Sequence, residues 1–203
     1  MLNPGAGLAL VHDTSVRADW INIIQTGVEA FGPITVLVNN TGIQPATSCW
    51  QSPDVKSVKT KNVDAWAHFT GMETVVPFMK RAGIGSIVEV APLELHDASA
   101  YVDTLATGQR AVNAFLRTIA AELASFNIRV NVIARGPVGK PRMQDALSLS
   151  SSAEDISGDG YFDSPRLADD VGQLVLYLAS DESSPMTGIL HIIGCTSSNV
   201  REH

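Results

Sequence analysis

The segment Val36–Gly42 places the strongest constraint on how this chain can fold. It reads Val-Leu-Val-Asn-Asn-Thr-Gly, a short apolar run that ends abruptly in polar residues and a glycine. Such a run suits a strand buried on both faces of a parallel sheet. Asparagine and glycine tolerate left-handed backbone, and asparagine bonds to nearby amides, so the strand leads into a shaped turn. In open α/β sheets, ligands bind at this carboxyl end of the strands.

Further apolar runs alternate with helical patterns along the chain. Strands are predicted at Leu8–Val11, Ile34–Val38, Ser86–Ala91, Ile128–Ile133 and Ile189–Ile193. Helices are predicted at about 16–31, 53–79, 105–125 and 165–180. The alternation shows no break in composition and no internal repeat. It therefore predicts one α/β domain over residues 1–203, built on a parallel sheet.

Charge and apolar content argue against several classes of partner. The formal net charge is −7 and the pI is about 5.1, which disfavours nucleic acid and anionic membranes. No apolar run approaches the roughly 18 residues of a membrane span, and residues 1–5 do not resemble a secretory signal. Cys49 and Cys195 offer neither a disulfide framework nor metal-ligand spacing. We expect a cytoplasmic protein that acts on a small molecule and holds no metal.

Several short motifs, taken together, resemble those of the short-chain dehydrogenase/reductase family. Asn39–Gly42 is similar to the family's Asn-Asn-Ala-Gly, with Thr41 in place of alanine. The other matching segments are Lys61–Val63, Ala120–Leu123, Ile128–Val132, Leu178–Asp181 and Thr187–Gly188. The resemblance extends from about Leu8 to Cys195. It implies a Rossmann-like parallel sheet flanked by helices.

The start of the chain departs from the family pattern. The family begins with a strand and a Gly-rich turn that opens a helix and holds the pyrophosphate of the cofactor. Here Gly5 and Gly7 have no strand before them and precede what aligns as the family's third strand. The first two strands of the family are therefore expected to be absent, and no residue is assigned to a cofactor. We expect Leu8–Val11 to lie beside Ile34–Val38 instead, giving about five strands.

The catalytic set that the resemblance implies is also altered. The family uses Ser, Tyr and Lys, the Lys lowering the pKa of the Tyr so that it can exchange a proton. Alignment places Pro92 at the Ser position, Leu105 at the Tyr position and Gln109 at the Lys position. None of these side chains can perform that chemistry, and only Asn62 of the family set is retained. Hydride transfer by the family mechanism is not expected.

A polar loop after the Ser86–Ala91 strand offers alternative catalytic groups. His96, flanked by Glu94 and Asp97, is a candidate general acid or base. Tyr101 is a candidate donor to a developing oxyanion, and Asn62 completes this candidate set. The competing interpretation is a solvated loop, with Tyr101 at a surface and Asn62 in a structural role.

Substrate contacts are assigned to residues near the predicted strand ends, namely Trp50, Pro92, Leu105, Arg135 and Lys140. Arg135 and Lys140 suit an anionic substrate, although solvated loop cations are the simpler interpretation. Glu89 lies within a strand predicted to be buried. If Glu89 points inward it needs a partner, and if it lies toward a helix edge it is an ordinary polar residue.

Three functions follow from these observations. The first is a cofactor-independent, non-redox enzyme, an isomerase, cyclase or lyase acting on a small organic molecule, as in a biosynthetic pathway. The second is a pseudoenzyme that binds a partner or ligand. The third, an atypical NAD(P)-dependent oxidoreductase, rests on the family resemblance alone. The family commonly dimerises through a bundle of helices, so we expect a homodimer through the helices at 111–125 and 167–179.

Overall fold

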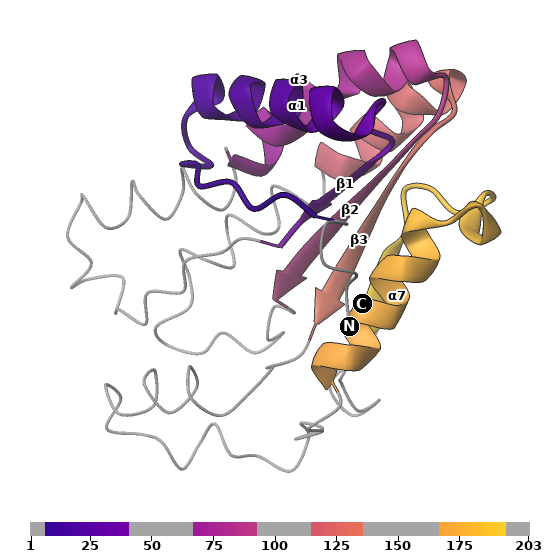
Figure 1. Cartoon of the computed structure of the whole chain (residues 1–203). Coiled ribbons are helices and arrows are strands. Elements are labelled where there is room, and N and C mark those ends of the chain that lie inside the picture. The colour runs from indigo at the N-terminus through magenta and orange to yellow at the C-terminus, as the bar shows by residue number, and fades with distance from the viewer. Residues whose placement is uncertain (1–6, 41–66, 93–114, 136–166, 194–203) are drawn as a thin grey trace, which may run out of the picture.

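In the computed structural model, β2 (Gly85–Pro92) runs through the interior of a parallel sheet (Figure 1). The structure describes residues 7–40, 67–92, 115–135 and 167–193. The sheet in these residues has the order β1-β2-β3-β4. The other strands are β1 (Val36–Asn39), β3 (Ile128–Arg135) and β4 (Leu190–Ile193). Each pair of neighbours is parallel, which requires a crossover between them.

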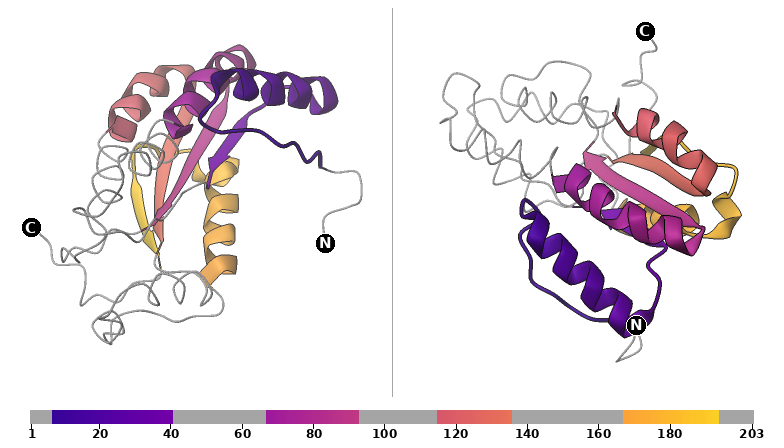
Figure 2. Two further views of the ribbon diagram at one scale, coloured as in Figure 1. Left: turned by 90° about the vertical axis from the view of Figure 1, so that its left-hand side faces the viewer. Right: turned by 90° about the horizontal axis from the view of Figure 1, so that it is seen from above.

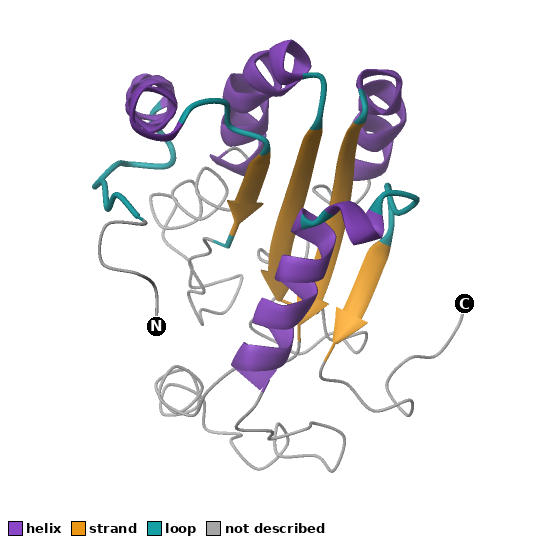
Figure 3. Ribbon diagram, turned by 45° about the vertical axis from the view of Figure 1, so that its right-hand side comes forward, coloured by secondary structure: helices purple, strands orange, loops and turns teal. Residues whose placement is uncertain are grey.

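Helices cover both faces of the sheet (Figures 2 and 3). On one face lie α1 (Arg17–Phe31), α3 (Ala67–Ala82) and the helical residues 115–123, and on the other lies α7 (Leu167–Ala179). Short 3₁₀ turns follow two of them, η2 (Ala124–Phe126) and η3 (Asp181–Ser183). None of the helices in the described ranges combines the length and hydropathy that crossing a membrane requires.

Alternation along β2 decides which side chains meet which helices. Ile87 packs into the core beneath α1 and α3, whereas Val88 and Val90 pack into the core beneath α7. Successive side chains of a strand point to opposite faces, so Glu89 lies on the α3 side with Ile87. The apolar run of β2 therefore has the burial on both faces that an interior strand of a parallel sheet implies. The same expectation for Val36–Val38 is wrong, because Val36 and Val38 of β1 are 38% and 40% exposed.

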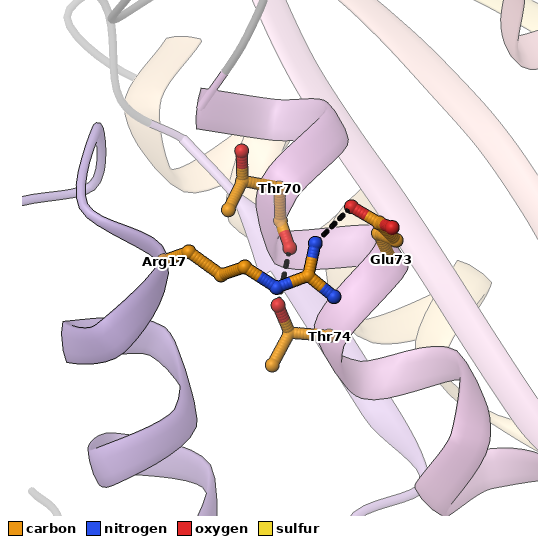
Figure 4. A network of polar contacts seen from close by, with 4 residues as sticks. All are labelled: Arg17, Thr70, Glu73 and Thr74. Carbon is orange, nitrogen blue, oxygen red and sulfur yellow. Dashed lines mark hydrogen bonds and ion pairs between the residues drawn. The ribbon is translucent and has the colours of Figure 1, made fainter.

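The helix α1 docks against α3 through a tryptophan. Trp20 is 6% exposed and its ring lies over Gly71 of α3, where an added Cβ would come within 2.8 Å of the ring. The indole Nε1 donates a hydrogen bond of 2.8 Å to the carbonyl oxygen of Thr14. At the edge of this contact Arg17 pairs with Glu73, beside the bond from the Thr74 hydroxyl to the Thr70 carbonyl (Figure 4). The ion pair is half-exposed, so the packing of Trp20 supplies most of the attachment.

The helix α7 is tied to the other face by buried polar contacts. The Ser86 hydroxyl of β2 donates to the Leu178 carbonyl at 2.7 Å. Arg129 of β3 donates to the Ser183 hydroxyl at 2.7 Å and to the Ser180 carbonyl at 3.0 Å. These bonds satisfy carbonyl groups at the end of α7 that the helix itself leaves without partners.

The expected strand at Leu8–Val11 is wrong. Residues 7–13 have no strand structure, and within the described residues β1 pairs with β2 alone. Val11 is fully exposed, and Leu8 and Leu10 are 49% and 43% exposed. The apolar run is short, and the residues after it make local contacts instead: His12 packs edge-on against Trp20, and Asp13 bonds to Ser15. The sheet therefore has four strands in the described residues.

The contact between Trp20 and Gly71 predicts that adding a single methyl group at Gly71 lowers the free energy of unfolding. Gly71→Ala places a methyl group where the indole ring lies, and overpacking of this kind costs about 1–3 kcal/mol of the free energy of unfolding. Urea unfolding followed by Trp fluorescence measures the loss.

The matched control is Gly172→Ala in α7, where nothing lies within 4 Å of the added Cβ. Removing a glycine from a helix interior there stabilises by about 0.5–1 kcal/mol. Equal effects of the two substitutions would contradict the packing that we describe.

Candidate functional site

Three polar side chains are buried together near the carboxyl end of β1. Asn39 is the last residue of β1 and stands in register with Glu89 of β2. His68 comes from the first turn of α3 that the structure describes. Their exposed fractions are 5% for Asn39, 0% for Glu89 and 2% for His68. We call these three residues the polar triad.

Glu89 contacts both other members of the polar triad. The Asn39 Nδ2 group donates to Glu89 Oε1 at 2.7 Å and to the His68 carbonyl oxygen at 3.4 Å. The other carboxyl oxygen, Oε2, lies 2.5 Å from His68 Nδ1. Both oxygens of the carboxyl group are thus in contact with a nitrogen. A buried carboxylate is tolerated only with such partners, because burial removes its hydration.

The polar triad shows which of the two orientations considered for Glu89, inward or toward a helix edge, the side chain adopts. The side chain points inward, into the space between the sheet and α3, and has the partner that an inward carboxyl needs. Asn39 and His68 were not among the residues that the sequence predicted for a site. The only available signal was a Glu within an apolar strand, because its partners lie 50 residues away in β1 and on a neighbouring helix.

The structure describes two of the predicted site residues. Pro92 is the last residue of β2, Arg135 is the last residue of β3, and the two stand in register. Arg135 is partly buried. Their backbones therefore meet at the carboxyl edge of the sheet, and their role as substrate contacts stays a prediction. The other predicted site residues, Trp50, Asn62, Glu94, His96, Asp97, Tyr101, Leu105 and Lys140, lie outside the described residues.

The described residues do not fit the pyrophosphate of a dinucleotide. None of the described glycines directly follows the carboxyl end of a strand. Just before α1, carboxylates already accept hydrogen bonds from the amides of Asp13 and Ser15 and from the Ser15 hydroxyl. Asp19 Oδ2 accepts from the Asp13 amide at 2.8 Å, and Asp13 Oδ1 accepts from the Ser15 amide and hydroxyl at 2.9 Å and 2.6 Å. These negative charges repel a phosphate rather than attract it. Within the described ranges, no group of three or more His, Cys, Asp or Glu side chains gathers that could hold a metal ion.

Comparison with known proteins identifies relatives along almost the whole chain. The model of the enoyl-(acyl carrier protein) reductase family matches residues 3–194. Trans-4-hydroxycyclohexanecarboxylate dehydrogenase of Sinomonas cyclohexanicum is 33% identical over 91% of this chain and 69% of its own length. The 3-oxoacyl-[acyl-carrier-protein] reductase FabG of Thermotoga maritima is 33% identical over 91% of this chain and 74% of its own length. A 3-alpha-(or 20-beta)-hydroxysteroid dehydrogenase of Mycobacterium bovis is 32% identical over 90% of this chain and 68% of its own length.

These relatives overturn the first function expected from the sequence. A cofactor-independent isomerase, cyclase or lyase is contradicted, because the relatives are named dehydrogenases and reductases. The expectation failed because it weighed the substituted positions Pro92, Leu105 and Gln109 above the family resemblance. The third expectation, an atypical oxidoreductase, agrees better with these findings.

Solved structures agree with the fold. Levodione reductase superposes with a TM-score of 0.81 at 24% identity, over 92% of this chain and 75% of that chain. NAD⁺-bound xylitol dehydrogenase superposes with a TM-score of 0.76 at 23% identity, over 92% of this chain and 78% of that chain. The solved structures show the fold alone. The family model matches residues 3–194, and the curated relatives are 32–33% identical, so these two findings show the family as well. This chain belongs to the short-chain dehydrogenase/reductase family.

Proposed function

We propose that this chain is an atypical NAD(P)-dependent oxidoreductase that interconverts an alcohol and a carbonyl group. The observation that carries the proposal is the agreement among relatives that match about nine tenths of the chain, all named as dehydrogenases or reductases. The substrate class follows from two of these names, a hydroxylated cyclohexane carboxylate and a hydroxysteroid. Both names denote a hydroxylated compound with a carbocyclic skeleton.

The proposed chemistry differs from the family pattern in its proton-transfer groups. We assign proton exchange with the substrate oxygen to His96, with Glu94 or Asp97 beside it, and to Tyr101. Asn62 keeps its position from the family set. Because the described residues do not fit a pyrophosphate, the proposal assigns the nucleotide to none of them. The location that we propose is the cytoplasm, where NAD(P) is abundant.

The proposed substrate contacts lie at the carboxyl edge of the sheet. Arg135 ends β3 at this edge, and with Lys140 it would hold an anionic group of the substrate. Trp50, Leu105 and Pro92 would contact the apolar ring. The carboxylate in the substrate of the Sinomonas relative is a group of the kind that two cations recognise.

Nucleotide binding tests the proposal directly. Titration of the purified protein with NADH and NADPH is expected to change nucleotide fluorescence and to raise the melting temperature. A ligand that binds only the folded state adds about 2.7 kcal/mol of stability at 100 times its dissociation constant. Absence of both changes for both nucleotides would rule out the oxidoreductase. ATP serves as the control for non-specific nucleotide binding.

Turnover then tests the substrate class. With NAD⁺ or NADP⁺, trans-4-hydroxycyclohexanecarboxylate is the first alcohol to assay, and cyclohexanol is its neutral control. Arg135→Gln is expected to raise KM for the carboxylate about tenfold or more, because a charge-assisted bond contributes roughly 1.5–3 kcal/mol. KM for cyclohexanol should stay unchanged. An equal rise for both alcohols would contradict the role of Arg135.

A second function, partner binding, is favoured by exposed apolar side chains on α7 and β4. Leu176 is 65% exposed and Tyr177 is 37% exposed on α7, while Leu190 and Ile192 of β4 are 47% and 45% exposed. By register Leu190 and Ile192 share the face of Val132, which is the face opposite α7, so the exposed apolar side chains lie on both faces of the sheet. Exposed apolar side chains of this kind are found at protein interfaces. We propose that the partner is a second copy of this chain, docked through 167–179 and 111–125. This arrangement is compatible with either an enzyme or a pseudoenzyme.

A charged substitution in the proposed interface tests the dimer. Leu176→Glu is expected to convert the dimer to a monomer in light scattering, while the unfolding free energy of the monomer changes by less than about 0.5 kcal/mol. Val11→Glu is the matched control, since it also charges a fully exposed apolar residue but lies before α1. A wild-type chain that is monomeric at high concentration would contradict the proposed interface.

A further inference from the structure

We propose that Glu89 and His68 form a buried acid–base pair in which Glu89 holds the proton of His68 on Nδ1, so that Nε2 is the nitrogen that gains and loses a proton. Glu89 is then a positioning residue for the imidazole. This pair is separate from the substituted Ser, Tyr and Lys positions of the family. The proposal concerns the state of the imidazole and does not rest on the proposed redox function.

The first step of the argument is the orientation of Asn39. Its Nδ2 group contacts two oxygens, Glu89 Oε1 and the carbonyl oxygen of His68. An amide nitrogen can only donate, and both of these oxygens accept. The amide therefore cannot be flipped without placing its own oxygen against two acceptors. Asn39 fixes Oε1 of Glu89 as an acceptor.

The second step is the proton between Glu89 and His68. Glu89 Oε2 and His68 Nδ1 are 2.5 Å apart, and both are fully buried. Two facing lone pairs repel at this distance, and a proton on one of the two atoms removes that repulsion. A ring N–H donates and a carboxylate oxygen accepts, so the proton is placed on Nδ1. A neutral imidazole has one protonated nitrogen, so Nε2 is the other, titrating nitrogen.

The third step is the surroundings of the pair. Along β2 and across to β3, the neighbours of Glu89 on its face of the sheet are Ile87 and Val132, both apolar and buried. Glu89 is the one ionisable residue of β2, and β1 has none. On α3, Glu73 is engaged with Arg17 at the surface. On β3, Arg129 is engaged with Ser183 and Ser180 on the opposite face.

The other ionisable side chains of the packed elements, within the described residues, are Asp19 and Glu29 of α1, Lys80 and Arg81 of α3, Arg117 and Glu122 of residues 115–123, Arg135 of β3, and Asp169, Asp170 and Tyr177 of α7. Lys80 and Arg81 lie in the last turn of α3, whereas His68 lies at its other end. Arg135 is three residues beyond Val132, the register partner of Glu89. The proposed tautomer follows from the contact between His68 Nδ1 and Glu89 Oε2.

The substitution Glu89→Gln makes a sharp prediction. The Oε1 atom of glutamine can still accept from Asn39, which leaves its NH₂ group facing His68 Nδ1. An NH₂ group only donates, so Nδ1 must become the acceptor and the proton must move to Nε2. Glu89→Gln is thus expected to switch the tautomer of His68 with little change in shape.

The experiment is ¹⁵N NMR of the full chain with labelled histidine, recorded as the pH is raised and lowered around neutrality. In the wild type, His68 Nδ1 is expected to stay protonated throughout, and only Nε2 should lose its proton. In Glu89→Gln, Nδ1 is expected to be the nitrogen without a proton in the neutral ring. His12 and His191 are internal controls whose tautomers should not change.

Two results would overturn the proposal. One is a wild-type His68 whose Nδ1 loses its proton while Nε2 keeps it. The other is a folded Glu89→Gln protein whose His68 keeps the wild-type tautomer. The wild-type measurement decides the question even if Glu89→Gln does not fold. Failure of nucleotide binding leaves both spectra unaffected, so the two proposals fail independently.

Discussion

The burial of β2 on both faces is the constraint on which the rest of this structure depends. A strand covered by α3 on one side and α7 on the other must find partners for every polar side chain that it carries. The Ser86 hydroxyl bonds to α7 and the Glu89 carboxyl bonds to β1 and α3. These bonds tie α7 to one face of β2 and α3 to the other through specific donor and acceptor pairs.

The sequence predicted the elements well where local pattern determines them. The helix at Arg17–Phe31 and the strands at 85–92, 128–135 and 190–193 agree with the predictions to within one or two residues, because apolar periodicity and glycine turns act locally. Leu8–Val11 was wrong for a related reason. Its apolar run looks like a strand, but a strand also needs a neighbour, which a local pattern does not supply.

The candidate site was less predictable than the fold. Pro92 and Arg135 were placed at the carboxyl edge because strand ends follow from strand boundaries. The polar triad joins Asn39 to a residue 50 positions away, and no spacing in the sequence encodes that pairing. The redox class came from relatives and not from the residues, since Leu105 and Gln109 argue against it. The family defines the kind of chemistry, and the substituted positions define where this chain must differ.

The strand order β1-β2-β3-β4 has a consequence for how the chain folds. Each described strand pairs with the one before it in the sequence, so each crossover can close as soon as its second strand is available. The bond from Ser86 to Leu178 behaves differently, because it joins residues 92 positions apart. Contacts between residues so far apart in the sequence form only after the chain between them has been made, and the entropic cost of closing the loop rises slowly with its length. We therefore expect the second face of β2 to remain open to water until α7 arrives, which makes this face the surface most in need of protection during synthesis.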